Sequence, residues 1–177
     1  KPAQCPECGG FDLIEKKAIE VGNIFKLGSR FSDAFGLTVA DEKGQEQKVI
    51  MGCYGIGPSR IMGTLVEVHH DDKGIIWPSN VAPFQAHLIS LCKEDSDKRQ
   101  AEEIYQRIGQ NGVEVLFDDR EGVTAGEKFA DSDLFGIPFR LVVSSKTLAN
   151  NSVEIKSRDN CEVSLLKIDK IEETIIG

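Results

Sequence analysis

Long apolar runs are absent from this 177-residue sequence, and no segment reaches the roughly 20 apolar residues that a membrane-spanning helix needs. The first ten residues, KPAQCPECGG, also lack the apolar segment of a secretory signal peptide. Because they contain no initiator methionine, we expect the chain to be a fragment of a longer protein. These absences argue against a membrane-spanning protein and predict no membrane partner.

Cysteine is sparse, and its spacing is irregular. There are five cysteines, an odd number, and only Cys5 and Cys8 show the two-residue separation typical of metal ligands. A closed zinc site needs four ligands, whereas Cys53, Cys92 and Cys161 are scattered along the chain. We therefore expect no zinc and no other bound metal. An odd and irregular set of cysteines is typical of reduced thiols, which predicts a cytoplasmic protein.

An excess of basic residues, the usual mark of a nucleic-acid-binding protein, is also missing. The formal net charge is −8, and residues 81–177 carry most of it. Because phosphate neutralisation supplies most non-specific affinity for nucleic acids, the sequence predicts weak general RNA binding. A local site that reads a few nucleotides remains compatible with this charge.

The pattern of apolar residues changes near PSNVAPF, residues 78–84, where two prolines stand among small polar residues. Before this segment we expect a strand at 18–27, a hairpin at 37–51, a helix at 58–69 and a short strand at 75–78. After it we expect strands at 85–92, 112–119 and 137–145, helices at 95–110 and 124–136, a hairpin at 152–168 and a closing helix at 169–177. This alternation predicts an α/β fold with a mostly parallel sheet and two domains, residues 1–80 and 81–177.

The segment IMGCYGIGPSR is the first candidate site. Gly52, Gly55 and Gly57 precede Pro58, the expected first residue of the helix, and Arg60. Glycine lets the backbone approach a ligand, a helix N-terminus offers free N–H groups, and arginine suits phosphate. The segment matches neither the P-loop nor the dinucleotide fingerprint. Its spacing leaves two interpretations open, a nucleotide site or a glycine-rich strand end packed against a neighbour.

A second candidate segment, FDDREGVTAGEKFADSDLFG, begins where the strand at 112–119 ends. Loops at the carboxyl ends of parallel strands bind ligands in open α/β sheets. Carboxylates can accept hydrogen bonds from guanine, arginine can donate to base edges, and an aromatic ring can stack on an unpaired base. An ordinary acidic loop in solvent is the alternative. The candidate residues are Asp118, Asp119, Arg120, Lys128 and Phe129, with Arg120 and Lys128 as first choices.

MGCYGIGPSR followed by an apolar helix resembles motif 3 of class II aminoacyl-tRNA synthetases. Together with IEVGNIFKLGSRFSDAFGLTV, GIIWPSNVAPFQ and DDREGVTAGEKFADSDLFGIPFR, it is similar to bacterial-type prolyl-tRNA synthetases over nearly the whole chain. The resemblance implies an α+β catalytic remnant with antiparallel strands and the motif 3 helix at residues 1–80. It also implies a three-layer α/β anticodon-binding domain with a mixed sheet of about five strands at residues 81–177.

The resemblance also implies roles for individual residues. Arg60 matches the motif 3 arginine, a catalytic residue that contacts the adenine and γ-phosphate of ATP, and Gly57 lies beside it. Phe25 and Cys53 match walls of the proline pocket, where Gly55 lets the substrate lie against the backbone. The residues of the second candidate segment would read the two guanines of the proline anticodon.

Two residues depart from the family pattern. Asn23 stands where the family commonly has histidine, and Lys26 stands where it commonly has glutamine. Both substitutions alter the geometry expected for the amino-acid and ATP sites. Without the resemblance, Phe25 and Cys53 would be interpreted as core residues.

In the full-length enzyme, the resemblance implies ATP-dependent ligation of L-proline to tRNA(Pro), with Mg²⁺ accompanying ATP and a homodimer built through motif 1. Motifs 1 and 2 are missing from this sequence, so we expect the fragment alone to be inactive. One alternative is a non-catalytic nucleic-acid-binding or interaction module related to synthetase anticodon-binding domains. Another is a nucleotide sensor that uses only the Arg60 loop.

Overall fold

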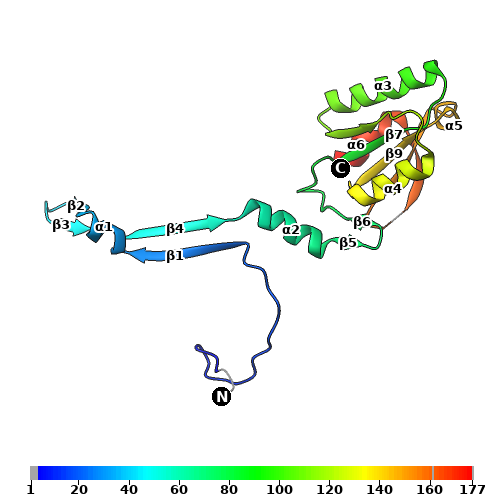
Figure 1. The fold of residues 1–177 in the computed structure, drawn as a ribbon. Coiled ribbons are helices and arrows are strands. Elements are labelled where there is room, and N and C mark those ends of the chain that lie inside the picture. The colour runs from blue at the N-terminus through cyan, green and yellow to red at the C-terminus, as the bar shows by residue number, and fades with distance from the viewer. Residues whose placement is uncertain (1–3, 161, 177) are drawn as a thin grey trace. The chain divides into compact units, whose positions relative to one another are not determined.

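The computed structural model describes residues 4–160 and 162–176, and the chain divides into two compact units (Figure 1). Unit 1 comprises residues 1–64 and unit 2 comprises residues 65–177. The division lies within helix α2, Pro58–Val68, whereas the sequence pattern changes at residues 78–84. In the part of the chain that is described, no helix is long and apolar enough to cross a bilayer.

Unit 1 consists of short antiparallel strand pairs. Its elements are β1 (Gly22–Gly28), α1 (Arg30–Ala34), β2 (Thr38–Ala40), β3 (Glu46–Lys48), β4 (Met51–Ile56) and the start of α2. β1 pairs with β4 and β2 pairs with β3, which confirms the predicted antiparallel strands. The β2–β3 turn forms because the Asp41 carboxylate accepts the N–H groups of Lys43 and Gln45, while Gly44 adopts a φ of 75°.

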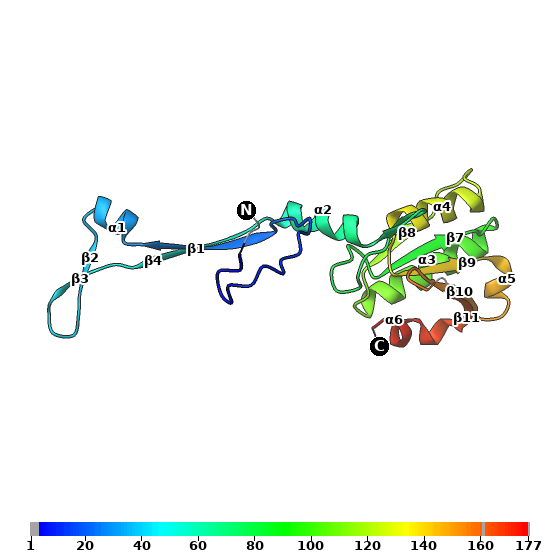
Figure 2. The same ribbon diagram turned by 90° about the horizontal axis from the view of Figure 1, so that it is seen from below.

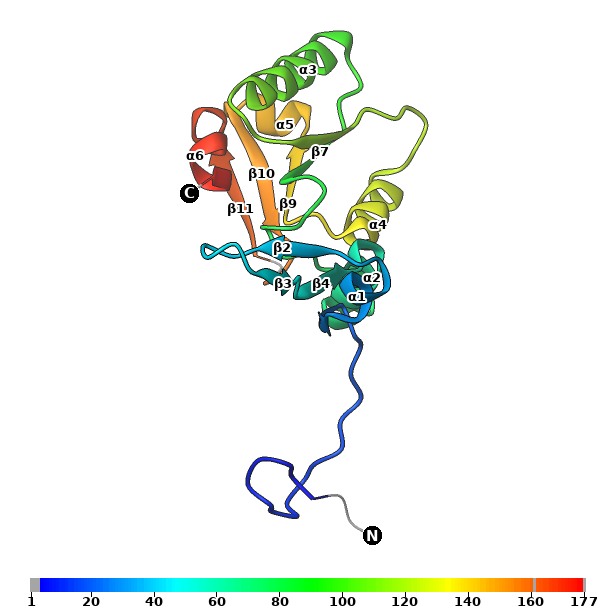
Figure 3. The same cartoon turned by 90° about the vertical axis from the view of Figure 1, so that its left-hand side faces the viewer.

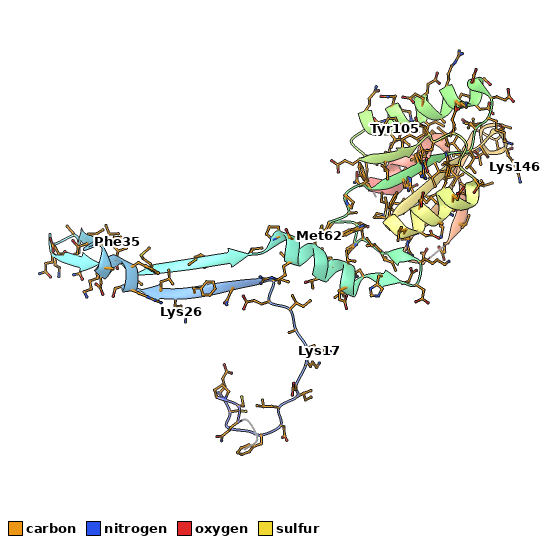
Figure 4. All side chains as sticks on the ribbon, viewed as in Figure 1. Lys17, Lys26, Phe35, Met62, Tyr105 and Lys146 are labelled. Carbon is orange, nitrogen blue, oxygen red and sulfur yellow. The ribbon has the colours of Figure 1, made fainter. Side chains whose placement is uncertain are left out.

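Large apolar side chains of unit 1 are exposed, and Figure 4 shows side chains projecting from β1 and β4 without a covering layer. Ile24, Tyr54 and Ile56 are 66%, 77% and 74% exposed. The predicted buried face of α2 is wrong for this structure, because no side chain of this helix is buried. Two paired strands cannot enclose a core by themselves, so the unit leaves its apolar faces open.

Unit 2 contains a five-stranded sheet. Its elements are β5 (His70–Asp71), β6 (Gly74–Ile75), β7 (Ala86–Ser90), α3 (Asp95–Gln110), β8 (Val115–Asp118), α4 (Ala125–Phe135), β9 (Phe139–Val143), α5 (Ser145–Leu148), β10 (Ser152–Ser157), β11 (Val163–Lys167), a 3₁₀ turn (Ile168–Lys170) and α6 (Ile171–Ile176). The strand order is β11-β10-β9-β7-β8, in which β7 is parallel to β8 and β9 while β10 is antiparallel to its neighbours. This mixed sheet confirms the predicted fold of the second domain.

Helices cover the sheet on both faces, with α4 on one side and α3 and α6 on the other (Figure 2). Figure 3 shows α3 and α5 beside the β7–β9–β10 part of the sheet. The main apolar core lies on the α3 and α6 side, where Leu88, Ala101, Ile108, Leu141 and Ile171 are fully buried. The three layers therefore place the carboxyl ends of the parallel strands at one edge, next to the start of α3 and α4.

The β5–β6 hairpin packs against the end of α4. A Cβ added at Gly74 would lie 2.4 Å from Leu134 Cα, and one added at Gly136 would lie 1.9 Å from a carbonyl oxygen of β6. Arg158 binds both oxygens of Asp71, at 2.6 and 2.8 Å. These contacts tie residues 70–75 to the sheet domain.

The predicted strand at 75–78 is wrong beyond Ile75. The Trp77 N–H donates to the Gly136 carbonyl, and Pro78 has no N–H to donate, so the ladder of β6 ends. Two short helices, α1 and α5, lie where the sequence pattern predicted only connections or strand ends. Each is one turn or little more, which is too short to show a helical period.

Candidate nucleic-acid interface

A pocket of about 780 Å³ opens at the carboxyl ends of β7 and β8, the edge where open α/β sheets bind ligands. Its walls are the two strand ends, the first turns of α3 and the loop that leads into α4. The pocket, here termed the strand-end pocket, is lined by Ser90, Leu91, Cys92, Lys93, Lys98, Glu102, Phe117, Asp119, Arg120, Glu121, Gly122, Val123, Thr124, Ala125 and Lys128. Two polypeptide segments therefore meet around one concave surface.

Lys128 lies at the base of this pocket and is only 2% exposed. Its ammonium donates to the Ser90 carbonyl at 2.9 Å and to the Asp118 carbonyl at 3.3 Å. Nζ also lies 3.4 Å from Oδ1 of Asp118, whose side chain is 5% exposed. Lys128 and Asp118 thus hold the ends of β7 and β8 together, with little of either side chain at the surface.

Arg120 is held in one orientation by two carboxylates. Its Nε and Nη2 donate to Asp118 at 2.9 and 2.8 Å, and Nη2 also donates to Asp131 at 2.8 Å. Burial raises the pKa of Asp118, but hydrogen bonds from Arg120 and the charge of Lys128 outweigh it and lower this pKa to about 2. Arg120 Nη1 has no hydrogen bond to any residue that the structure describes, and the side chain is 47% exposed. The guanidinium is therefore oriented in advance and can still donate to a ligand.

The other two predicted side chains of this segment differ in accessibility. Asp119 is exposed at the pocket wall. Phe129 is half-buried, and the Arg140 guanidinium lies 4.4 Å from the centre of its ring. Because that cation covers one face of the ring, at most the other face can meet a base.

Sequence reasoning missed the α3 side of the pocket. Lys98, in the first turns of α3, forms an ion pair with Glu121 of the opposite wall, and its hydrogen bond to Glu121 raises the pKa of Lys98. Lys93 and Glu102 lie on the same side. The position of α3 in the chain could have indicated these residues. This helix follows β7, so it begins at the same edge of the sheet where the parallel strand β8 ends. Four cationic and three anionic side chains line the pocket, and the carboxylate of Asp118 beneath them pairs with two of the cations, so the charges at the pocket are close to balanced within an acidic domain.

The loop wall is fixed by the start of α4. Thr124 accepts from the Glu127 N–H at 3.2 Å, and the Glu127 carboxylate accepts from the Thr124 N–H at 2.9 Å. This capping box satisfies donors at the helix start and fixes where the loop ends. The pocket wall is therefore anchored at both ends, by Arg120 and by Thr124.

In unit 1, Arg60 lies in the first turn of α2 and Gly57 precedes the helix. The Gly57 N–H donates to the Val21 carbonyl at 3.0 Å. A Cβ at Gly57 would lie 3.3 Å from Arg60 Cβ, so a side chain there would crowd the arginine. Arg60 donates to the Glu20 carbonyl at 2.6 Å, and its side chain is 57% exposed. The guanidinium is thus accessible beside a glycine and a helix N-terminus.

The residues predicted for the proline pocket lie together. Phe25 and Cys53 are directly opposite each other in the β1–β4 ladder. A Cβ at Gly55 would lie 3.8 Å from a ring carbon of Phe25. Side chains two apart on a strand share a face, so Phe25, Cys53 and Gly55 form one side of the ladder. Phe25 is 45% exposed, and it does not pack in a core as the alternative interpretation would require.

The structure describes four cysteines, Cys5, Cys8, Cys53 and Cys92, all as free thiols, whereas Cys161 lies outside the described residues. Over residues 4–160 and 162–176, no three His, Cys, Asp or Glu side chains gather as a metal-binding group.

Two family models match the chain. The model described as "Anticodon binding domain" matches residues 81–177, and "tRNA synthetase class II core domain (G, H, P, S and T)" matches residues 11–69. The strand-end pocket therefore lies within the match to an anticodon-binding domain.

Known proteins resemble nearly the whole chain. The proline–tRNA ligase of Pelobacter propionicus is 47% identical over 173 residues, which are 97% of this chain and 30% of that protein. The proline–tRNA ligase of Desulforamulus reducens is 46% identical over 165 residues, which are 93% of this chain and 29% of that protein. The chain spans about 30% of the length of these relatives.

A solved structure agrees with these relatives. The prolyl-tRNA synthetase from Cryptosporidium parvum, complexed with L-proline and AMP, has a TM-score of 0.80 and 29% sequence identity, covering 88% of this chain and 33% of that one. The resemblance inferred from the motif segments is thereby confirmed. The anticodon-binding model covers more than half of the chain and prolyl-tRNA ligases match nearly all of it, so the chain belongs to the prolyl-tRNA ligase family of class II aminoacyl-tRNA synthetases.

Proposed function

We propose that this chain is the anticodon-reading and motif 3 part of an enzyme that joins L-proline to tRNA(Pro) with ATP. One observation carries the proposal: the strand-end pocket, within the match to an anticodon-binding domain, presents an oriented guanidinium beside an exposed carboxylate. Unpaired bases are recognised by such donors and acceptors on their edges.

In this proposal, Asp119 and Arg120 contact the anticodon bases directly. The Asp119 carboxylate accepts from the N1–H and N2–H groups of a guanine, and the accessible Nη1 of Arg120 donates to an oxygen or nitrogen of a base edge. Asp118 and Lys128 position Arg120 and the strand ends, since both are buried and paired. Phe129 supports the binding surface with the ring face that Arg140 leaves open.

The charge of the domain supports selective rather than strong binding. Residues 81–177 carry most of the net charge of −8, so repulsion by phosphates opposes general RNA binding. At the pocket, by contrast, cations and anions are close to balanced, because Asp118 pairs with Arg120 and Lys128. Affinity should therefore depend on the anticodon bases more than on RNA length.

In unit 1 we assign Arg60 and Gly57 to ATP, and Phe25, Cys53 and Gly55 to proline. The accessible guanidinium of Arg60 next to a helix N-terminus fits a nucleotide phosphate or base. Mg²⁺ is proposed to accompany ATP in the longer enzyme, as the family resemblance implies, and we assign it no ligand among the residues that the structure describes.

The open faces of β1, β4 and α2 support completion of this unit by further chain of a longer enzyme. We infer that the 177 residues alone do not activate proline. The longer enzyme is proposed to be a cytoplasmic homodimer, as the family resemblance implies. A purely non-catalytic binding module is less favoured, because residues 11–69 match the class II core domain.

The test is a titration of the chain with tRNA(Pro) and with a copy whose anticodon guanines are replaced, at one salt concentration. We expect the unaltered tRNA to bind about 10-fold more tightly, because a lost base contact costs about 1–3 kcal/mol. Arg120→Ala and Asp119→Asn should remove this preference, whereas Arg99→Ala, an exposed arginine of α3 outside the pocket, should keep it. Equal affinity for both tRNAs in the parent chain would refute anticodon reading by this pocket.

A further inference from the structure

Asp131 of α4 is the second carboxylate that holds Arg120, and it lies outside the lining of the strand-end pocket. Oδ2 of Asp131 accepts from Nη2 of Arg120 at 2.8 Å, although the two residues are 11 positions apart in the chain. Arg120 and Asp119 are among the residues that line the pocket, whereas Asp131 is not. A ligand in the pocket therefore meets Arg120 and Asp119, and Asp131 acts on it only through Arg120.

The helix that carries Asp131 is fixed on the sheet, so this carboxylate has a defined position. Lys128, one helical turn earlier, is buried and donates to the carbonyls of Ser90 and Asp118. The capping box at Thr124 fixes the start of the same helix. Side chains carried by a rigid helix or strand are held more accurately than those on loops. Asp131 is therefore well placed to set the orientation of a neighbouring side chain.

The contacts of Arg120 divide its N–H donors into an engaged set and a free pair. Nε and Nη2 each donate to Asp118, at 2.9 and 2.8 Å, and Nη2 uses its other N–H for Asp131. The N–H groups of Nη1 have no acceptor among the residues that the structure describes. With Asp118 alone, Nη2 would offer a further free donor. Asp131 therefore restricts what Arg120 presents to a ligand to one nitrogen.

We propose that Asp131 is a positioning residue for guanine recognition, because it holds Arg120 so that Nη1 alone donates to the base. This inference rests on the proposed function of the strand-end pocket. The pairing edge of guanine places the O6 acceptor beside the N1–H donor, whereas adenine places an N6–H donor beside the N1 acceptor. A fixed donor at Arg120 and an acceptor at Asp119 match guanine, and both contacts oppose adenine. A guanidinium that turns and also offers Nη2 can donate to either base, which relaxes the selection.

The test compares two substitutions of Asp131 that remove the same charge. Asp131→Asn keeps an oxygen that accepts from Nη2, whereas Asp131→Ala does not. The 177-residue chain is titrated with tRNA(Pro) and with a copy whose anticodon guanines are replaced by adenines, at one salt concentration. The parent chain and Asp131→Asn should bind the unaltered tRNA about 10-fold more tightly. In Asp131→Ala this ratio should fall to about 3-fold or less, because a misaligned donor loses most of its hydrogen bond.

The direction of the change in affinity separates positioning from folding. Loss of a negative charge near phosphates should leave the altered tRNA bound as tightly as before, or slightly more tightly, in Asp131→Ala. Misfolding would instead weaken the binding of both tRNAs. The ion pair of Arg120 and Asp131 is partly exposed and contributes little to stability, so the unfolding transition of Trp77 should shift little. Glu103→Ala removes the same charge from an exposed position of α3 outside the pocket and should keep the parent ratio.

The positioning role of Asp131 would be overturned by an undiminished ratio in Asp131→Ala. Asp118 alone would then orient Arg120, and anticodon reading by the pocket would stand. A ratio lost equally in Asp131→Asn and Asp131→Ala would assign the effect to charge and overturn the role of the hydrogen bond. Equal affinity of the parent chain for the two tRNAs would refute anticodon reading itself, and the role of Asp131 with it.

Discussion

Replacing Lys128 by methionine tests whether this residue is a structural element of unit 2. The Lys128 ammonium is buried, donates to two backbone carbonyls and pairs with Asp118. Removing one partner of a buried ion pair costs about 3–5 kcal/mol. Arg120 still pairs with Asp118 in the variant, which places the expected loss near the lower end, at about 3 kcal/mol.

The assay is urea unfolding followed by the fluorescence of Trp77, the single tryptophan of the chain, which lies in unit 2. Urea unfolding should show the loss of about 3 kcal/mol directly, and thermal unfolding followed by the same fluorescence should show a Tm lower by roughly 10 °C for a domain of this size. Lys93→Met is the matched control, because Lys93 lines the same pocket but is exposed, and it should change stability by less than about 0.5 kcal/mol. If Lys128→Met is as stable as Lys93→Met, the structural role of Lys128 is refuted. Lys128 would then again be a candidate for direct contact with the anticodon bases.

Three further predictions concern the same unit. Burial lowers the pKa of His87 to about 4, although the charge of Asp118 opposes this shift. Below pH 6.5 the unfolded chain therefore binds more protons at this residue than the folded chain does. The free energy of unfolding should fall by about 3 kcal/mol between pH 6.5 and 4. Urea unfolding at several pH values should show this slope flattened in His87→Gln and retained in His70→Gln. Gly136→Ala should destabilise the unit by at least about 3 kcal/mol, because the new Cβ meets a backbone oxygen at 1.9 Å and φ is 72°, whereas Gly109→Ala in α3 should stabilise it slightly. Thr124→Ala removes the helix cap and should cost about 1 kcal/mol in thermal unfolding.

The helices and strands of unit 2 were largely predictable, because each has a period long enough to be recognised. The helix expected at 95–110 is α3, Asp95–Gln110, and its buried Ala101, Ile104 and Ile108 are spaced as one helical face requires. By contrast, α5 is four residues long and is defined by the capping box of Ser144 and Thr147, which only the folded backbone reveals.

The sequence predicted the position of the site but not which of its side chains are buried. The sequence pattern located the loop after β8, because parallel strands end at one edge. It could not show that Lys128 points inward beneath that loop, since a lysine on a short polar helix looks the same whether it is buried or solvated. Lys98 was missed because its partner, Glu121, is 23 residues away in the chain. The apolar face of α2, which is only partly covered, was mispredicted as buried because apolar periodicity indicates that a face needs a cover but does not show whether the chain itself provides one.

The contacts of the β5–β6 hairpin define which piece can be transplanted between related enzymes. A chimera joined at residue 81 would discard Asp71, which pairs with the buried Arg158. It would also discard β6, whose backbone packs directly against Gly136, and so would uncover the end of α4. A chimera that exchanges residues 65–177 as one cassette preserves both contacts. The hairpin thus belongs structurally with the sheet domain, and the safest junction for such a chimera lies before it in the chain.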